Sequence, residues 1–461
     1  MTISPFDTIA AVSTPFGKGG VAVIRLSGDE AFSVVSRVFF PVGGKRLADY
    51  PPRTAVYGLI RDPDSGAVLD DGLCTLFHGP NSFTGEDTAE ISCHGGVLVT
   101  RNVLEACLRA GARQAIAGEF TRRAYMNGKL ELERAEALGN LLDAGNDEQV
   151  KLARAGMNGL LTHSAEAVYE SLMDVLSNME AGMDFPEEDL TEMPFGELRE
   201  VIRRAEADLH DLVQTYRTGR AIAEGIPTVI CGRPNVGKSA FYNRLLGREA
   251  AIVTDIAGTT RDVLTETVSV GRVTLRLSDT AGLRESDDPV ERIGVERARR
   301  ALEESELALV LTDTDGGVAA CEAEELIRRL DEQGRTVIRV YTKSDLGAPC
   351  GTPDDGIPTV VLSSVTGEGF NDLTRVVEAA FIDGELRMGE EAVVFSARQA
   401  AALRQAAAYL GTALDNLDGG LPYDICADDI RAAMGELGML CGRESSEEVL
   451  TEIFSRFCVG K

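Results

Sequence analysis

The sequence predicts a multidomain protein of the α/β and α classes, with a mostly parallel α/β domain inserted into a helical domain. Two observations predict this. The apolar run 226–231 ends in a glycine-rich loop at Gly232–Ser239, and a helical pattern follows. Apolar residues recur at helical spacing within 161–212, before this unit, and within 403–437, after it. Apolar helix faces need partners, so the two helical stretches are expected to form one domain around an insert.

The 461 residues should form two or three domains. We expect domains at 1–120 (mixed α/β front domain), 121–221 (helical domain, first part), 222–382 (inserted domain) and 383–461 (helical domain, second part).

The front domain should contain several strands and two helices. Strands are expected at 21–26, 54–60, 73–77 and 88–93, and helices at 29–39 and 96–110. The loop Pro80–Asp87 (PNSFTGED) is polar and acid-tipped, which indicates a binding loop. His94 is interpreted as a capping or core histidine.

From Gly118 the pattern becomes helical and carries the most basic patch of an acidic chain. A solvated helix face is an equally good interpretation of this patch. The patch consists of Arg122, Arg123, Lys129 and Arg134. Ser445–Glu448 has the form of a capping box for a last helix.

Composition excludes several classes of protein. The formal charge of −28 argues against loose electrostatic binding of nucleic acid, so an RNA partner would need a local basic surface or recognition by shape. Nine scattered cysteines without a CxxC pair predict neither disulfides nor a zinc site. There is no long apolar run and no signal-like N-terminus, so we expect a cytoplasmic protein without a membrane partner.

The loop Gly232–Ser239 (GRPNVGKS) fits the phosphate-loop pattern of Gly, four free positions and Gly-Lys-Ser. Between a strand and a helix, successive backbone N–H groups converge on an anion, and the helix N-terminus adds positive partial charge. Lys238 should neutralise the outer phosphates, and the Ser239 hydroxyl should ligate magnesium.

Downstream motifs indicate GTP. Asp279 in DTAG should hold magnesium through water, while Gly282 offers its N–H to the terminal phosphate. In TKSD, the Asp345 carboxylate can accept two hydrogen bonds from guanine. The usual motif begins with Asn where this chain has Thr342, which puts one base contact in doubt. Ser363-Ser364 stand where many GTPases have Ser-Ala.

Together these motifs predict a Ras-like P-loop GTPase domain. The expected GTP-binding residues are Asn235, Val236, Gly237, Lys238, Ser239, Ala240, Thr254, Asp255, Ile256, Ala257, Gly258, Thr259, Thr260, Asp279, Thr280, Ala281, Gly282, Thr342, Lys343, Asp345, Ser363 and Ser364.

The hydrolytic machinery departs from the Ras pattern. Leu283 stands where Ras-like enzymes carry a water-orienting Gln. Glu291 is a candidate for that role, although it could equally be a helix N-terminal carboxylate stabilised by the dipole. Transition-state charge could be stabilised by Arg284 or by a monovalent cation held by Asn235.

The chain ends in Phe457–Lys461 (FCVGK). With PNSFTGED, GEFTRRAYMNGK and the inserted GTPase domain, this end makes the whole chain resemble the MnmE/TrmE family of tRNA modification GTPases. The segments Gly247–Val263 and Asp279–Gly294 are especially similar to that family.

The resemblance implies a front domain similar to tetrahydrofolate-binding domains, through which members form homodimers. It implies that the G domains pair across the nucleotide and are activated by potassium, with Glu291 as catalytic glutamate. The implied ligands are Arg25, Glu90, Lys129 and Lys461 for folate, Asn235, Thr254, Ile256 and Thr259 for potassium, and Ser239 and Thr260 for magnesium.

The resemblance also implies a reaction. With a FAD-containing partner, MnmG (GidA), members add a carboxymethylaminomethyl or aminomethyl group to carbon 5 of the wobble uridine of certain tRNAs. A reduced folate, 5-formyl- or methylene-tetrahydrofolate, supplies the linking carbon. No DNA partner is implied.

Cys458 could be the nucleophile that activates the uridine by adding at carbon 6, because Lys461 could lower the pKa of its thiol. It could also pack the last helix as a small apolar residue, or shape the folate pocket. The partner flavoenzyme is another source of the nucleophile.

Two other functions stay open on the sequence alone. One is a regulatory GTPase of ribosome assembly without substrate chemistry, which would lack the front domain and the FCVGK end. The other is a folate enzyme that is gated by GTP and acts on a small molecule.

Overall fold

A computed structural model describes most of the chain. It covers residues 7–184, 193–249, 265–278, 302–313, 318–349, 351, 353–382, 391–443, 447–455 and 457–460. The chain divides into two compact units, residues 1–139 with 441–461 and residues 140–440. None of the helices among the described residues combines the length and the apolar character that a membrane span requires.

The first unit is built on a seven-stranded sheet with the order β3-β4-β5-β6-β2-β1-β7. Its strands are β1 (Ile9–Val12), β2 (Val21–Ser27), β3 (Phe39–Pro41), β4 (Val56–Arg61), β5 (Val68–Phe77), β6 (Thr88–His94) and β7 (Arg113–Gln114). Its helices include α1 (Ala31–Val38), the 3₁₀ turn η1 (Leu47–Asp49), α2 (Val97–Arg109) and α3 (Glu119–Met126). The predicted strands and helices of the front domain are confirmed, although β5 begins at Val68 and not at Leu73.

Side chains of the sheet alternate between two cores. Ala10 joins the apolar side chains of α1 and α2 on one face, whereas its neighbours Ile9 and Ala11 pack with Phe120 of α3 on the other. This is the period of two that a strand imposes. Helices therefore cover both faces of the sheet at β1.

The C-terminal segment belongs to the first unit. Helix α15 (Glu447–Ser455) packs against the start of α4 (Leu132–Asp143) through Leu450, Phe454 and Leu132. Beyond it, Val459 forms an antiparallel bridge with Ala117, and the Ser13 hydroxyl donates to the carbonyl of Gly460 at 3.0 Å.

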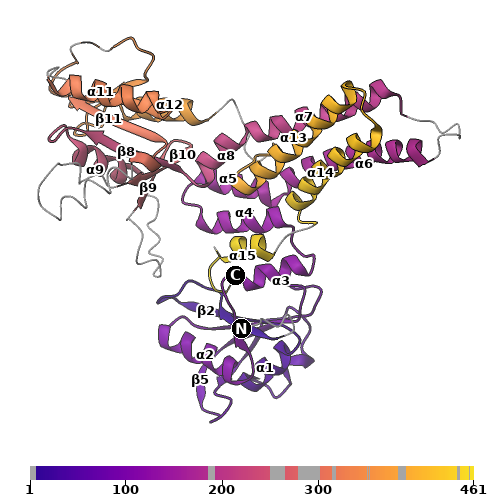
Figure 1. The fold of residues 1–461 in the computed structure, drawn as a ribbon. Coiled ribbons are helices and arrows are strands. Elements are labelled where there is room, and N and C mark those ends of the chain that lie inside the picture. Colours follow the sequence, from indigo (N-terminus) through magenta and orange to yellow (C-terminus); the bar gives the residue numbers. More distant parts are fainter. Residues whose placement is uncertain are drawn as a thin grey trace, which may run out of the picture. The chain divides into compact units, whose positions relative to one another are not determined.

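The second unit contains the helical domain. Its helices are α5 (Asp147–Met157), α6 (Leu160–Asp184), α7 (Phe195–Gln214), α8 (Tyr216–Ala223), α13 (Ala397–Asp418) and α14 (Tyr423–Leu440). Figure 1 shows α13 and α14 lying alongside α6 and α7. Arg199 of α7 pairs with Asp418 of α13 at 2.6 Å, and Arg431 of α14 pairs with Glu180 of α6 at 2.6 Å. Helices from before and after the inserted domain thus form one bundle, as predicted.

The inserted domain has a six-stranded sheet with the order β13-β12-β11-β8-β10-β9, in which β9 and β10 are antiparallel and the other pairs are parallel. The strands are β8 (Ile226–Gly232), β9 (Thr265–Val270), β10 (Val273–Ser278), β11 (Leu307–Asp313), β12 (Thr336–Thr342) and β13 (Thr359–Val361). The helices α9 (Lys238–Glu249) and α12 (Phe370–Phe381) share one core with the sheet, and α11 (Val318–Glu332) shares another. The mostly parallel sheet is confirmed. Its parallel strands bring their carboxyl ends to one edge.

Candidate functional site

The phosphate loop joins β8 to α9, and its shape is set by residues in left-handed conformations. The φ angles are 143° at Gly232, 67° at Asn235 and 99° at Gly237. A Cβ atom at Gly232 would lie 2.4 Å from the carbonyl oxygen of Leu311, so only glycine fits there. A backbone that turns in this way directs successive N–H groups toward a common anion.

Lys238, the first residue of α9, folds its side chain over this loop. Its Nζ donates to the carbonyls of Gly232 at 2.6 Å and Arg233 at 2.7 Å. Ser239 and Ala240 follow in the first turn and are exposed. The loop therefore combines amide donors, an ammonium group and an accessible hydroxyl, a donor set that fits a polyphosphate with its magnesium ion.

The predicted base-recognition segment follows β12. Asp345 is exposed, and its Oδ1 accepts a hydrogen bond of 2.5 Å from the hydroxyl of Ser363. Ser363 is fully buried, and its oxygen also accepts from the N–H groups of Val365 and Thr366. The turn after β13 therefore fixes the orientation of the carboxylate.

The sequence predicts Thr342 as one of the GTP-binding residues, at a position where the usual motif has Asn. In the structure it is buried, and its Oγ1 lies 2.6 Å from the carbonyl oxygen of Val236 and 3.1 Å from that of Thr312. Lys343, which follows, has a positive φ of 60°. The base-recognition segment is thus joined to the phosphate loop, a contact that the sequence pattern did not reveal.

Several predicted site residues lie outside the described residues. These are Thr254, Asp255, Ile256, Ala257, Gly258, Thr259, Thr260, Asp279, Thr280, Ala281, Gly282, Arg284, Glu291 and Lys461. The structure brings the described ones together in two groups, one at the phosphate loop and one in the first unit.

In the first unit, Arg25 and Glu90 face each other across β2 and β6. The Arg25 Nε donates to Glu90 Oε1 at 2.9 Å. The guanidinium lies 5.4 Å from the ring centroid of Phe83 and 5.7 Å from that of Phe120, so cation–π contacts also hold it. Phe83 belongs to the loop Pro80–Asp87, which places this pair beside the predicted binding loop.

Lys129 borders the same loop. A Cβ atom at Gly85 would lie 3.1 Å from Lys129 Cγ, and the neighbouring Asn127 donates its amide to the Thr84 carbonyl at 2.7 Å. Lys129 itself is exposed. Three of the four predicted folate ligands therefore lie near one loop: Arg25 and Lys129 beside it, and Glu90 as the partner of Arg25.

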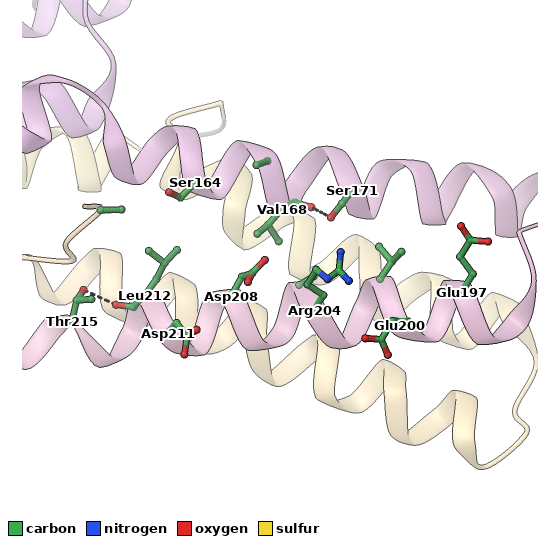
Figure 2. A pocket seen from close by; sticks show the side chains of 14 residues that line it. Ser164, Val168, Ser171, Glu197, Glu200, Arg204, Asp208, Asp211, Leu212 and Thr215 are labelled. Carbon is green, nitrogen blue, oxygen red and sulfur yellow. Dashed lines mark hydrogen bonds between the residues drawn. The ribbon is translucent and has the colours of Figure 1, made fainter. Parts of the chain in front are cut away.

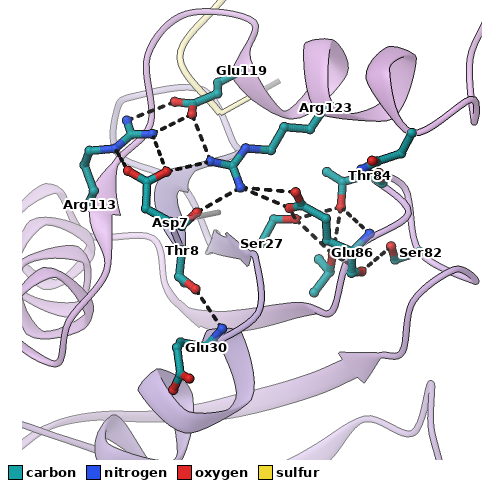
Figure 3. A network of polar contacts seen from close by, with 12 residues as sticks. Asp7, Thr8, Ser27, Glu30, Ser82, Thr84, Glu86, Arg113, Glu119 and Arg123 are labelled. Carbon is teal, nitrogen blue, oxygen red and sulfur yellow. Dashed lines mark hydrogen bonds and ion pairs between the residues drawn. The ribbon is translucent and has the colours of Figure 1, made fainter. Parts of the chain in front are cut away.

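A buried polar network holds this loop from behind, and sequence reasoning missed it. Figure 3 shows Arg123 at its centre, bonded to Glu86 Oε2 at 3.1 Å, Glu119 Oε1 at 3.1 Å and the Asp7 carbonyl at 2.9 Å. The Ser27 hydroxyl donates to Glu86 at 2.7 Å. The interpretation of Arg123 as part of a basic patch is wrong, because its side chain is buried among carboxylates.

Arg113 extends the network by pairing with both Asp7 and Glu119 at 2.7 Å. The hydrogen bond from Arg113 holds the pKa of Asp7 below its ordinary value. Burial alone would raise the pKa of Glu119, but hydrogen bonds from Arg113 and from the Ile116 N–H outweigh it and lower that pKa.

His94 is neither a core nor a capping histidine, so that interpretation is wrong. Its side chain is 67% exposed, and its Nδ1 lies 2.8 Å from Asp70 Oδ1. The hydrogen bond to Asp70 raises the pKa of His94 above its ordinary value. Asp71 lies close by and accepts a hydrogen bond from the Tyr57 hydroxyl at 3.0 Å.

Cys458 is exposed, so its thiol does not pack the last helix. Its carbonyl accepts a hydrogen bond of 3.4 Å from the Gly118 N–H, next to the bridge between Ala117 and Val459. Cys107 and Cys231 are different: they are buried, and burial raises the pKa of each thiol to about 12.

A groove of about 780 Å³ lies between α6 and α7 in the helical domain (Figure 2). Carboxylates border it, with Arg204 among them and Val168 and Leu212 on its apolar part. The carboxylates are those of Glu197, Glu200, Asp208 and Asp211. Their charge disfavours a phosphate-bearing ligand in this groove, and none of the predicted site residues lines it.

Comparisons with known proteins cover the whole chain. Residues 8–129 match the family described as GTP-binding protein TrmE N-terminus, and residues 132–458 match the MnmE helical domain. The chain is 42% identical over 460 residues to the tRNA modification GTPase MnmE of Symbiobacterium thermophilum and 38% identical over 460 residues to that of Acetivibrio thermocellus, with 99% of each chain covered in both cases.

Two solved structures are similar over part of the chain. The G domain of the T. maritima FeoB iron transporter is 25% identical with a TM-score of 0.25, covering 33% of this chain and 97% of that one. An Aquifex aeolicus Era variant bound to GDP·AlF4⁻ is 25% identical with a TM-score of 0.26, covering 40% of this chain and 65% of that one. Because both TM-scores are below 0.5, the full-length sequence matches are the informative part of the comparison.

Proposed function

The chain belongs to the MnmE/TrmE family of tRNA modification GTPases, and from this we propose the reaction that its GTPase activity drives. With a FAD-containing partner, MnmG (GidA), it adds a carboxymethylaminomethyl or aminomethyl group to carbon 5 of the wobble uridine of certain tRNAs. The linking carbon comes from 5-formyl- or methylene-tetrahydrofolate. The observation that carries the proposal is the match to tRNA modification GTPases along 99% of the chain.

GTP is assigned to the phosphate loop. The amides from Asn235 to Ser239 and the ammonium of Lys238 would hold the phosphates, and Asp345, fixed by Ser363, would accept hydrogen bonds from guanine. The hydroxyls of Ser239 and Thr260 would hold magnesium, which neutralises charge on the phosphate oxygens.

Hydrolysis is assigned to Glu291 and to a potassium ion. Glu291 would orient the attacking water, because Leu283 has no polar group to do so. Potassium held by Asn235, Thr254, Ile256 and Thr259 would supply the positive charge when two G domains pair in a homodimer. Arg284 is the alternative source of that charge.

The reduced folate is assigned to the loop Pro80–Asp87. The N–H groups of a pterin ring can donate hydrogen bonds to a carboxylate such as that of Glu90. The Arg25 Nε holds this carboxylate by a hydrogen bond of 2.9 Å to Oε1. The glutamate tail of a folate is anionic, so Lys129 and Lys461 are suited to bind it. Cys458 has an exposed thiol that could add to carbon 6 of the uridine, although the flavoprotein could also supply this nucleophile.

The experiment that tests the proposal compares wobble nucleosides by mass spectrometry in cells that lack the protein. The parent chain should restore the modified uridines. Lys238→Ala should fail because it removes the ammonium that holds the phosphates, and Glu291→Ala should fail although it still binds GTP. Lys151→Ala is the matched control, since Lys151 forms an exposed pair with Glu148 in the helical domain.

Wobble uridines that are the same with and without the protein would contradict the proposed reaction. Weak GTP binding by Glu291→Ala, measured by calorimetry, would contradict the role of Glu291 in orienting water.

A further inference from the structure

The groove between α6 and α7 lies outside the sites assigned to GTP and to folate. Its volume is about 780 Å³, and its lining runs along α7 from Glu197 to Thr215. This stretch of α7 is about 27 Å long, or about five turns, at a rise of 1.5 Å per residue. A groove of that length matches a helix laid along it and is longer than a compact small molecule.

The wall formed by α6 is made of small side chains. Ser164, Ala167, Val168 and Ser171 line the groove at intervals that place them on one side of the helix. Figure 2 shows the two serines and Val168 on the side of α6 that faces α7. The serine hydroxyls donate to carbonyls of their own helix, from Ser164 to Leu160 at 3.0 Å and from Ser171 to Val168 at 2.8 Å. These hydroxyls therefore need no polar ligand, and the small side chains let another helix approach closely.

The wall formed by α7 combines apolar side chains with a charged border. Val201 and Leu212 line the groove and are half-buried. The carboxylates of Glu197, Asp208 and Asp211 are exposed, and they form no ion pair with any residue that the structure describes. Three uncompensated negative charges therefore border an apolar groove.

Charge decides which occupant fits. Nucleic acid, anionic lipid headgroups and a second copy of this chain, whose formal charge is −28, would all bring negative charge to the carboxylates of the border. A helix with an apolar face flanked by Lys or Arg would instead place apolar side chains against Val168, Val201 and Leu212, and its cations beside the carboxylates. The groove therefore fits a cationic helix.

Arg204 constrains the occupant further. It also lines the groove, four residues after Glu200 and four residues before Asp208, so the three side chains share one side of α7. The order of charge along this side is negative, positive, negative. A matching helix should carry an acidic residue between two basic ones at the same spacing, which would fix its register.

We propose that the groove between α6 and α7 binds a cationic amphipathic helix of a partner protein. The proposal goes beyond the proposed function, whose GTP and folate sites use no residue of this groove. It gives the helical domain a binding role of its own, in addition to carrying the inserted domain.

The test uses the full chain and three synthetic peptides as probes. The first peptide has Leu at helical spacing, Lys on both flanks of the apolar face and one central Glu. The second has Glu in place of every Lys, and the third has the composition of the first in an order without an apolar face. In fluorescence anisotropy, the first peptide should bind about tenfold tighter than the third or more, and the second should not bind measurably. Binding should weaken as salt rises from about 0.05 to 0.3 M, because salt screens exposed charges.

A triple variant tests the charged border. Glu197→Gln/Asp208→Asn/Asp211→Asn removes the three negative charges and keeps the size of each side chain. It should lower the affinity for the first peptide by about 5- to 50-fold, because each exposed charge pair contributes a few-fold at most.

A second triple variant is the matched control. Glu325→Gln/Asp415→Asn/Asp424→Asn changes the net charge by the same amount, at exposed positions of the same unit that do not line the groove. The affinity for the first peptide should stay at the parent value, because screening limits the reach of exposed charges.

Ala167→Tyr tests the shape of the groove. Ala167 is exposed and lines the groove, so the ring should fill the space and abolish peptide binding while the helices stay folded. Ala207→Tyr is the matched control, because Ala207 is exposed on α7 outside the lining, and it should bind the peptide like the parent. Circular dichroism should give the same helical signal for all variants.

Equal affinities for the first and third peptides would overturn the proposal, because they would mean that the acidic chain attracts any cationic peptide. Failure of the parent chain to bind the first peptide would also overturn it. So would parent-like affinity in the border variant or in Ala167→Tyr, because the peptide would then bind elsewhere. Self-association of the parent that Ala167→Tyr abolishes would assign the groove to a second copy of this chain instead.

Discussion

The phosphate loop and the loop Pro80–Asp87 are held in opposite ways. The phosphate loop takes its shape largely from within: left-handed residues at Gly232, Asn235 and Gly237 set the backbone, and Lys238 bonds to carbonyls of the loop itself. The loop Pro80–Asp87 is held by side chains from distant segments, with Arg123 of α3 as the central donor.

The two loops should therefore respond differently to single substitutions. The phosphate loop depends on few long-range contacts, chiefly that of Thr342 with the Val236 carbonyl, so single changes that spare this contact should leave its shape intact. A loop held by a buried ion-pair network depends on complete pairing, because removal of one partner leaves an uncompensated charge inside the protein.

The largest effect is expected for Arg123→Met. This change leaves the carboxylates of Glu86 and Glu119 without their shared partner, which should lower the free energy of unfolding of the first unit by about 3–5 kcal/mol. Hydrogen exchange would measure this, with faster exchange in residues 80–87 and unchanged exchange in the phosphate loop.

Arg46→Met is the matched control, because Arg46 forms an exposed pair with Asp49 in the same unit. Such a pair should contribute nothing measurable. Unchanged exchange around residues 80–87 in Arg123→Met would mean that the loop is held by other contacts, and the contrast between the two loops would disappear.

The same contrast explains what could be predicted from the sequence. The strand before the phosphate loop, the helix after it and the parallel sheet follow from short-range patterns, and the structure confirms them. The pattern PNSFTGED indicated a binding loop, but nothing local pointed to Asp7, Ser27 and Arg113 as parts of its support.

The errors have the same cause. Arg123 lies among other basic residues in the sequence, and its burial depends on carboxylates that approach from other segments. His94 is the last residue of β6, and its place in the sequence favours a core or capping interpretation, but its partner Asp70 comes from the neighbouring strand β5. The departure of Thr342 from the usual motif is visible in the sequence, whereas its contact with Val236 depends on the folded sheet. The strands β1 and β7 have only four and two residues, which is too short for the alternation of apolar and polar residues to identify them in the sequence.

A smaller effect is expected at Asn235, whose φ of 67° costs a typical side chain about 1 kcal/mol. Asn235→Gly should therefore leave the stability of the G domain nearly unchanged, whereas Asn235→Ala should lower it by about 1 kcal/mol. Both variants lack the side-chain oxygen proposed to bind potassium, so both should hydrolyse GTP equally fast in potassium and in sodium. Chemical denaturation and phosphate release would measure the two effects.

A stability loss in Asn235→Gly as large as that in Asn235→Ala would show that the side chain, and not the backbone conformation, holds the loop. Acceleration by potassium that persists in both variants would exclude Asn235 as a ligand of that ion. Equal rates in potassium and in sodium for the parent chain would instead favour Arg284 as the source of positive charge.

The smallest effect is expected for the pair of His94 and Asp70, which joins two neighbouring strands at the surface of the first unit. The Asp70 carboxylate raises the pKa of His94 above its ordinary value of 6.5, so this pair stabilises the fold below pH 6.5 and loses its effect as the pH rises through the raised value. NMR titration of the His94 ring should show the raised pKa, Asp70→Asn should return it toward 6.5, and Asp71→Asn should lower it less. An unaltered titration in Asp70→Asn would mean that exposure screens the pair completely, which would confine the importance of long-range ion pairs in this unit to the buried network around Arg123.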